Sequence, residues 1–256
     1  MSKERPAPVE ASRPEPKRHG LRETVIRALT RGPGDEALKD RAEWMVEELH
    51  IGMYLAPRIR YKEPGVLKPN NVEQGVFVVS IGAGKGHEMD EMDAILPGST
   101  IVGLDPDDYM TVPVAERLRS LAHDSVYLDE HSRAEHMRGI PDGSADGVTL
   151  NFVLHHIDRQ THGRVFDEIR RVLKPDGYIF IAEDLVDSAD EKRIVESEDR
   201  KINFEIAAEA PHEYRSVEQW REFFDVHGFE IVENHEVKPQ KVRHGFFVLR
   251  RKAIGR

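Results

Sequence analysis

The pattern of apolar and polar stretches predicts a core in which strands and helices alternate along the chain. Between the strands, apolar residues recur at helical spacing in the stretch HEMDEMDAIL and at Phe166, Ile169 and Val172, a helix expected to stop at Pro175 and Gly177. Strands that alternate with helices indicate an α/β fold built on a parallel sheet. Five apolar runs have the composition of strands buried on both faces, namely 76–79, 100–105, 125–130, about 147–152 and one that ends at Glu183 and Asp184.

Two segments precede this core. Residues 1–20 are charged and rich in proline, with almost nothing to bury, which predicts a disordered tail. Residues 21–75 are predicted to form a helical cap and a linker, because two stretches of helical spacing extend to about Leu55 and the prolines and glycine of 58–74 are typical of a connection. The main domain is then expected to span 76–256.

The second half of the main domain adds a helical insertion and a terminal hairpin. Residues 185–215 are highly charged and have helical spacing in their first part. Ser216 indicates the start of a further helix, and Gly228 its end. The apolar or alternating runs 229–237 and 244–252 predict an antiparallel hairpin at the end of the chain.

Composition narrows the class of protein. A chain of 256 residues is long enough for one well-buried α/β domain with an appendage. Its 37 Lys and Arg against 47 Asp and Glu give a net charge of −10, so nucleic acid is not the expected partner. The sequence contains no cysteine, which excludes disulfides and thiolate chemistry. No apolar stretch is long enough to cross a bilayer or to form a signal peptide, so we expect a cytoplasmic protein that does not associate with membranes; its oligomeric state stays open.

The stretch VFVVSIGAGKG carries the strongest functional signal. Gly82, Gly84 and Gly86 lie where a predicted strand passes directly into a predicted helix. Glycines at such a junction let the backbone approach a ligand, and the free N–H groups of the helix N-terminus attract a carboxylate or phosphate. A dinucleotide fingerprint needs its third glycine at the position of His87, so the spacing G-x-G-x-G disfavours a nicotinamide or flavin cofactor.

A second signal is Asp105, at the end of the next predicted strand. A carboxylate in this position can accept hydrogen bonds from both hydroxyls of an adenosine ribose. The alternative reading is an acid that caps a helix or a turn. The coincidence of strand end, spacing and glycine loop favours the ligand role.

Together with the stretches IPDGSADGVTLNFVLHHI and EIRRVLKPDGYIFIAED, the glycine loop resembles the class I S-adenosylmethionine-dependent methyltransferases, in particular those of type 11. The resemblance implies a Rossmann-like, doubly wound, seven-stranded sheet with an antiparallel C-terminal hairpin strand, with 185–215 covering the acceptor. One position departs from the family pattern, because Ser80 stands where the family carries an acid. The resemblance implies S-adenosylmethionine as cofactor, S-adenosylhomocysteine as product, and a cofactor site made of Ser80, Gly82, Ala83, Gly84, Gly86, Asp105, Asp129, Glu130 and Asn151.

Methyl transfer from this cofactor requires few catalytic groups from the protein. A sulfonium methyl group is already activated, so positioning the acceptor and excluding water supply most of the rate. An acceptor hydroxyl or ammonium group must also lose a proton, and the preferred base is His156, with His155 beside it. The other candidates near the carboxyl edge of the sheet are Asn151, Glu183, Asp184, His212 and Tyr214.

The expected function is methyl transfer to a small-molecule acceptor, with oxygen, nitrogen or carbon undetermined. The alternative is a non-catalytic protein that binds adenosylmethionine or serves in an assembly, motivated by Ser80. A macromolecular acceptor is disfavoured by the acidic balance. No metal site is expected, since the 13 histidines show no H-E-x-x-H spacing and no third ligand for His155 and His156 can be identified by spacing.

Overall fold

The structure is a computed structural model that describes residues 50–63, 71–84, 86–105, 126–129, 132–202, 212–238 and 241–253. The predicted tail at 1–20, most of the predicted N-terminal helices and Glu130 lie outside these residues. Of the second predicted N-terminal helix, the described part at 50–55 is helical and continues into the short 3-10 helix η1 (Ala56–Arg58).

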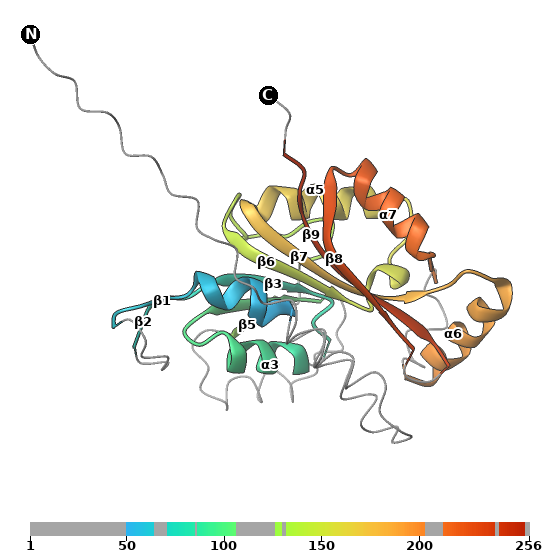
Figure 1. The fold of residues 1–256 in the computed structure, drawn as a ribbon, viewed down its shortest axis with the longest axis horizontal. Helices are drawn as coiled ribbons and strands as arrows, with labels where there is room; N and C mark the ends of the chain where they lie inside the picture. The colour runs from blue at the N-terminus through green and yellow to red at the C-terminus, as the bar shows by residue number, and fades with distance from the viewer. Residues whose placement is uncertain are drawn as a thin grey trace, which may run out of the picture.

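A seven-stranded sheet organises the molecule (Figure 1). Its strands lie in the order β5-β4-β3-β6-β7-β9-β8, so the chain starts in the middle, runs out to β5 and then crosses to the other side. All neighbours from β5 to β7 are parallel, whereas β9 is antiparallel to β7 and to β8. The strands are β3 (Phe77–Ile81), β4 (Thr100–Leu104), β5 (Val126–Asp129), β6 (Ala145–Asn151), β7 (Leu173–Leu185), β8 (Phe229–Val237) and β9 (Arg243–Arg251).

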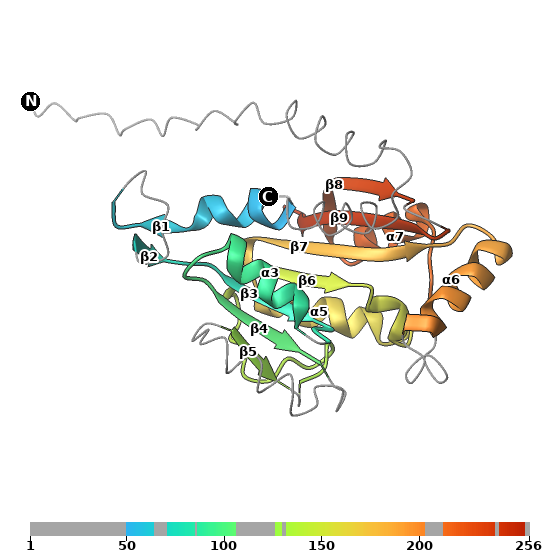
Figure 2. The ribbon, with the colours of Figure 1, turned by 90° about the horizontal axis from the view of Figure 1, so that it is seen from below.

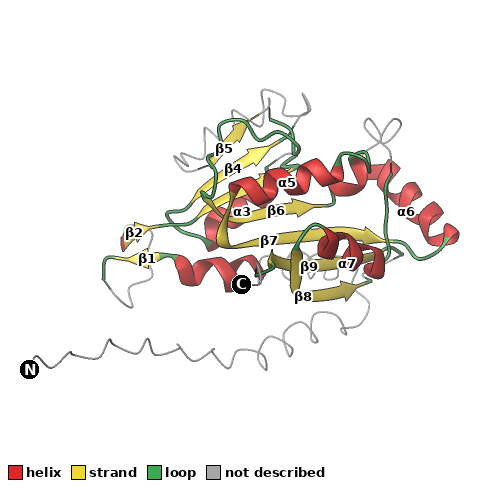
Figure 3. Ribbon diagram, turned by 90° about the horizontal axis from the view of Figure 1, so that it is seen from above, coloured by secondary structure: helices red, strands yellow, loops and turns green. Residues whose placement is uncertain are grey.

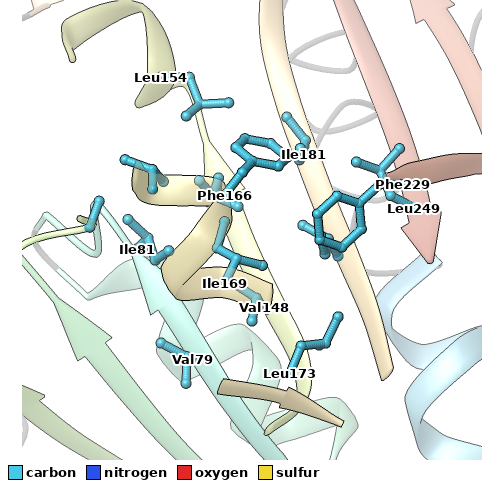
Figure 4. Packing of buried hydrophobic residues seen from close by; sticks show 14 of the residues in the cluster. Val79, Ile81, Val148, Leu154, Phe166, Ile169, Leu173, Ile181, Phe229 and Leu249 are labelled. Carbon is cyan, nitrogen blue, oxygen red and sulfur yellow. The ribbon is translucent and has the colours of Figure 1, made fainter. Parts of the chain in front are cut away.

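Helices cover both faces of this sheet, so that each face has its own apolar core. On one face lie α5 (His162–Val172) and α7 (Val217–Val226), and Figure 4 shows Phe166 and Ile169 over Val148 and Ile181 of the sheet. On the other face lie α3 (His87–Ile95) and the helical residues 50–55. The predicted α/β class with a central, largely parallel sheet is confirmed.

Side chains alternate between these two cores along each central strand. Val79 and Ile81 of β3 belong to the core under α5, and Val78 belongs to the core under α3. Ser80 therefore points to the α3 side, next to Thr149 of β6, with which it is in register. This alternation decides which side chains can meet at the carboxyl edge of the sheet.

The carboxyl edge is covered by α6 (Ala189–Ile202), which follows β7. In Figure 2 and Figure 3 this helix lies beyond the ends to which β6 and β7 point. It forms the described part of the predicted insertion at 185–215. Of the insertion, 203–211 lies outside the described residues.

Two local predictions need correction. The helix with Phe166 ends at Val172, before Pro175, because Leu173 already pairs with Ala145 as part of β7. The segment expected to be only a linker contains two short antiparallel strands, β1 (Arg60–Tyr61) and β2 (Val72–Gln74).

Helix α7 and the terminal hairpin follow the sequence prediction. Ser216 caps α7 through a capping box, since its Oγ accepts from the Gln219 N–H and the Gln219 side chain accepts from the Ser216 N–H. Gly228 follows with a φ of 72°. Across the described residues, we find no helix that combines the length and apolarity needed to cross a membrane.

Candidate functional site

The glycine loop leaves β3 at Ile81 and enters α3 at His87. Gly82, Gly84 and Gly86 have φ values of 71°, 48° and 72°, a region that favours glycine. A Cβ at Gly82 would also lie 2.2 Å from Val153 Cγ2, so this position has no room for a side chain. The Gly82 and Ala83 N–H groups donate to the Leu104 carbonyl at 2.8 and 3.2 Å. The loop is thereby fixed to the end of β4.

Asp105 joins the same loop from the end of β4. Its Oδ2 accepts a hydrogen bond from the Gly84 N–H at 2.9 Å, and the residue is 9% exposed. The two strongest signals of the sequence therefore meet in space. A carboxylate has two oxygens and about four lone-pair sites, so it can accept from more than one donor.

A buried carboxyl group that the sequence did not single out lies beneath this loop. Glu88, on the first turn of α3, faces Thr149, Asn151 and Ser80, whose side chains favour its charged form by hydrogen bonding. Burial is the larger influence and raises the pKa of Glu88 above its ordinary value. Glu88 Oε1, Ser80 Oγ and Thr149 Oγ1 are buried without a hydrogen-bond partner of standard geometry among the described residues.

Of the other residues predicted to hold the cofactor, Ala83, Asp129 and Asn151 belong to elements that reach the same edge of the sheet. Ala83 is buried in the loop, and Asn151 lies half-buried at the end of β6. Asp129 ends β5, which is in parallel register with β4 at Leu104. Glu130 lies outside the described residues.

A second cluster of polar groups surrounds the ends of β6 and β7. After β6, the 3-10 helix η3 (Leu154–His156) presents His155, whose Nδ1 lies 2.8 Å from Glu183 Oε2 of β7. The other carboxylate oxygen of Glu183 accepts the Val153 and Leu154 N–H groups at 3.1 and 2.6 Å. His155 and Glu183 are 1% and 0% exposed, so this pair is part of the interior.

Asp199 of α6 extends the cluster toward the insertion. Its Oδ1 lies 4.0 Å from His155 Nε2 and 3.5 Å from His156 Nε2, and its Oδ2 lies 3.6 Å from His212 Nδ1. Tyr214 stacks on His155 with ring centroids 5.0 Å apart. The cluster is anchored by the Glu213 N–H, which donates to the His155 carbonyl at 2.8 Å.

Burial and charge separate the two adjacent histidines. Burial lowers the pKa of His155, but the charge and hydrogen bond of Glu183 outweigh it and place the pKa above the ordinary value. For His156, burial and the neighbouring His155 lower the pKa to about 4. Burial also raises the pKa of Asp184, which lies 3.2 Å from His244, to about 6. His156 is therefore a neutral, weakly basic imidazole at neutral pH.

Comparison with known proteins identifies the domain. The methyltransferase domain family matches residues 79–181, which run from the middle of β3 into β7. This part of the chain is therefore a methyltransferase domain. The predicted resemblance to the class I S-adenosylmethionine-dependent methyltransferases is thus confirmed. Among curated protein sequences, nothing matches the chain significantly.

Solved structures share the methyltransferase fold. The 1,6-didemethyltoxoflavin-N1-methyltransferase of Burkholderia thailandensis, bound to 1,6-didemethyltoxoflavin and S-adenosylhomocysteine, is 18% identical with a TM-score of 0.60, covering 96% of this chain and 95% of that one. A geranyl diphosphate methyltransferase in complex with its cofactor is 14% identical, with a TM-score of 0.61 and coverage of 88% and 94%. The [4+2]-cyclase SpnF is 15% identical, with a TM-score of 0.61 and coverage of 92% and 94%. At these identities the likeness shows the fold alone.

Within the methyltransferase domain, the structure brings the glycine loop, Asp105 and Asn151 to one edge, and His155 and His156 to the neighbouring part of that edge. Reasoning from the sequence missed Glu88 and Asp199 in these roles. The only sequence signal for Glu88 was that position 80 carries a serine and not the acid of the family pattern. Asp199 lies in a run of charged residues that is typical of a solvated helix face.

Proposed function

We propose that this protein transfers a methyl group from S-adenosylmethionine to a small-molecule acceptor. The observation that carries the proposal is the contact between the Gly84 N–H and Asp105 Oδ2 at the carboxyl edge of a methyltransferase domain. Open α/β sheets bind ligands at this edge, where the order of the strands changes direction, and here that change falls between β3 and β6.

In this proposal the cofactor lies across the ends of β3, β4 and β5. The Asp105 carboxylate accepts the ribose hydroxyls, and Asp129 and Glu130 stay the residues predicted to bind the adenine. The methionine end lies over Gly82, Ala83, Gly84 and Gly86 and reaches toward Ser80 and Asn151. When bound, the cofactor supplies an activated methyl group on its sulfonium sulfur.

Glu88 takes the place of the acid that the family carries at the position of Ser80. Its carboxyl group reaches the same point from α3, between Ser80 and Thr149. A buried carboxylate without a cation is costly, and the ammonium group of the methionine end would supply that cation. No salt bridge among the described residues involves Glu88.

The acceptor would lie beside η3, under α6 and the segment with His212 and Tyr214. A small molecule is supported by the acidic net charge of −10, which disfavours nucleic acid. His156 stays the predicted base for an acceptor that must lose a proton, with His155 as the buried residue behind it. A pKa of about 4 makes His156 a weak base, so the proposal of methyl transfer does not depend on this role.

The alternative is a protein that binds adenosylmethionine without transferring its methyl group, and it was motivated by Ser80. The carboxyl group of Glu88 beside Ser80 supports the catalytic reading, because the charge missing at one position is present at the neighbouring one. Turnover across a panel of hydroxylated, amino and carbon-acid small molecules separates the two.

Cofactor binding is tested by the substitution Asp105→Asn. The amide oxygen can still accept from the Gly84 N–H, while the charge that binds the ribose hydroxyls is lost. Hydrogen bonds to charged groups contribute about 1.5–3 kcal/mol, so we expect about 10- to 100-fold weaker binding of S-adenosylmethionine by isothermal titration calorimetry. The control Asp176→Asn, in an exposed residue near the opposite end of β7, should leave the affinity unchanged. Equal affinity in all three proteins would contradict the assignment of Asp105.

A further inference from the structure

We propose that His155, His156 and Asp199 bind a divalent first-row transition metal ion. One ligand atom from each of the three residues lies within 4.8 Å of the others. Two of these atoms belong to adjacent residues of η3, and the third comes from α6, so the ion would join the edge of the sheet to the helix that covers it.

The spacing of the ligand atoms fits an ion of this size. Bonds of about 2.0–2.1 Å to nitrogen and oxygen in a tetrahedral site place two ligand atoms about 3.3 Å apart. Asp199 Oδ1 lies 3.5 Å from His156 Nε2 and 4.0 Å from His155 Nε2, and all three ligand atoms lie within 4.8 Å of one another, so the side chains would have to close in on the ion. His212, whose Nδ1 is 3.6 Å from the other oxygen of Asp199, is the nearest candidate for a fourth ligand.

The hydrogen bonds behind His155 orient it for a metal. Glu183 Oε1 already accepts two backbone N–H groups, and Oε2 faces His155 Nδ1 at 2.8 Å. A carboxylate oxygen only accepts, so Nδ1 carries a proton, and in the neutral form of the ring, which metal binding requires, Nε2 presents its lone pair toward Asp199. A carboxylate behind a histidine is the usual second layer of a metal site.

His155 Nε2 is an orphaned polar atom in the interior. It is buried, belongs to a residue that is 1% exposed, and has no hydrogen-bond partner among the described residues. Buried polar atoms are almost always satisfied, so an atom left open next to a second imidazole and a carboxylate points to a missing ligand.

The donor set indicates the class of ion. Two imidazoles and one carboxylate suit zinc, iron, cobalt or nickel better than magnesium or calcium, which prefer oxygen ligands. Three protein ligands leave a position open, as in catalytic metal sites. Given the proposed methyl transfer, on which this role rests, the ion would bind an acceptor oxygen and acidify it, replacing the general-base role predicted for His156.

A second group of possible ligands, His50, Glu233 and His235, provides an internal comparison. In this group Glu233 accepts a hydrogen bond from Tyr54 Oη at 3.0 Å and lies 3.3 and 2.5 Å from the two imidazoles. These residues belong to β8 and the helical residues 50–55, and β8 is separated from β6 by β7 and β9. A metal ion there would have to displace the existing contacts of Glu233, so we expect these residues to bind it weakly.

The test uses the full-length protein, stripped with a chelator and titrated with Co²⁺ and Zn²⁺. We expect one Co²⁺ per chain with the visible absorption of a four- or five-coordinate ion, displaced by Zn²⁺. Asp199→Asn should weaken Co²⁺ binding at least about 100-fold. Loss of a residue that only hydrogen-bonds to a ligand typically lowers metal affinity about 10- to 100-fold, and loss of a ligand itself should lower it more. Asp190→Asn, an exposed residue on the same helix, and His235→Gln should bind as the parent does.

Glu183→Gln tests the orientation of His155 without removing a ligand. An amide N–H₂ opposite Nδ1 would force the ring proton onto Nε2 and block the metal, so Co²⁺ binding should fall about 10- to 100-fold. Absent Co²⁺ binding, or binding unaffected by Asp199→Asn but lost in His235→Gln, would overturn the proposal.

Calorimetry with S-adenosylmethionine on the same samples separates this inference from the proposed function. If the variants bind the cofactor normally but lose Co²⁺, the metal site is supported. If the parent binds the cofactor and no Co²⁺, the metal site is wrong and the proposed function stands. If the parent binds Co²⁺ at these residues but not the cofactor, the metal site stands and the proposed function is wrong.

Discussion

In the proposed function, the single residue Glu88 supplies the acid that is missing at position 80. A serine at position 80 removes the expected acid from the end of β3, yet a carboxyl group reaches the same place from the first turn of α3. Burial raises the pKa of Glu88, which favours the protonated, neutral form of its carboxyl group until a cation binds beside it. The methionine ammonium of the proposed cofactor would be that cation.

The substitution Glu88→Gln should therefore have opposite effects on binding and on stability. Loss of the carboxylate should weaken S-adenosylmethionine binding by about 10-fold or more, measured by calorimetry at pH 7. The exposed Glu222→Gln on α7 is the matched control and should change neither property. An unchanged affinity in Glu88→Gln would contradict the compensating role.

The pH dependence of stability gives an independent check on Glu88. Because its pKa is raised on folding, the folded state binds more protons than the unfolded chain above the ordinary value of 4.5, and stability falls as pH rises through the window up to the raised pKa. In Glu88→Gln this fall in stability with rising pH should be absent. In urea unfolding, the variant should gain stability over the parent between pH 4 and neutral pH, and a constant difference would contradict the shift.

Gly82 combines two constraints that can be separated by experiment. Its φ of 71° costs a non-glycine residue about 1–2 kcal/mol, and a Cβ would also collide with Val153. Gly139→Ala is a control for the first constraint alone, because Gly139 has a φ of 76° and nothing within 4 Å of a Cβ. By urea unfolding, Gly82→Ala should lose about 1–3 kcal/mol more than Gly139→Ala, the range typical of overpacking. Equal losses would show that Val153 moves aside.

At the scale of elements, α7 is a helix whose start, buried face and end can be predicted from its own sequence. The capping box at Ser216, the apolar positions Trp220 and Phe224, and the glycine that follows are all visible in the sequence, and the helix forms where they predict it. Its apolar face packs against α5, with Phe166 and Phe224 centroids 5.8 Å apart. The cap acts on helix stability and lies away from the glycine loop.

Ser216→Ala should accordingly lower the free energy of unfolding by about 1 kcal/mol, the usual cost of removing an N-cap. Ser197→Ala, an exposed position within α6, should change it by less than about 0.5 kcal/mol. Chemical denaturation of both variants measures the difference. A loss as large in Ser197→Ala as in Ser216→Ala would show that the cap contributes nothing specific.

The same comparison shows where sequence reasoning reaches its limit. Apolar runs predicted β3 to β7 and the hairpin, because strand composition is local. The end of α5 was misplaced, since Leu173 is drawn into β7 by its pairing with Ala145 across the sheet. Glu88 and Asp199 escaped notice for a related reason: their roles come from residues that lie far away in the chain and meet only in the folded molecule.

At the scale of the whole molecule, the two ends of the sheet differ in how their polar groups are satisfied. At the amino end, Asp146 pairs with Arg58 and Lys174 and accepts the Phe77 N–H. At the carboxyl end, buried atoms of Ser80, Glu88, Thr149, His155 and His156 lack hydrogen-bond partners of standard geometry among the described residues. Polar atoms without such partners also occur elsewhere, for example in Trp220 and Arg251, but those at the carboxyl end lie where open α/β sheets bind ligands.

The strand order places two such groups side by side. The glycine loop and Asp105 follow β3 and β4, and the histidine cluster follows β6 and β7 on the other side of the switch in direction. A cofactor on the first group would point its methionine end toward the second. The arrangement is suited to transfer between two ligands that meet at the middle of the sheet.

The most direct test is a crystal structure of the full-length protein with S-adenosylhomocysteine. The account predicts the ribose hydroxyls at hydrogen-bond distance from the Asp105 carboxylate, and the amino-acid end over Gly82 and Gly84 with its ammonium beside Glu88. A nucleoside bound on another surface, or the space above the glycine loop filled by protein side chains, would contradict it.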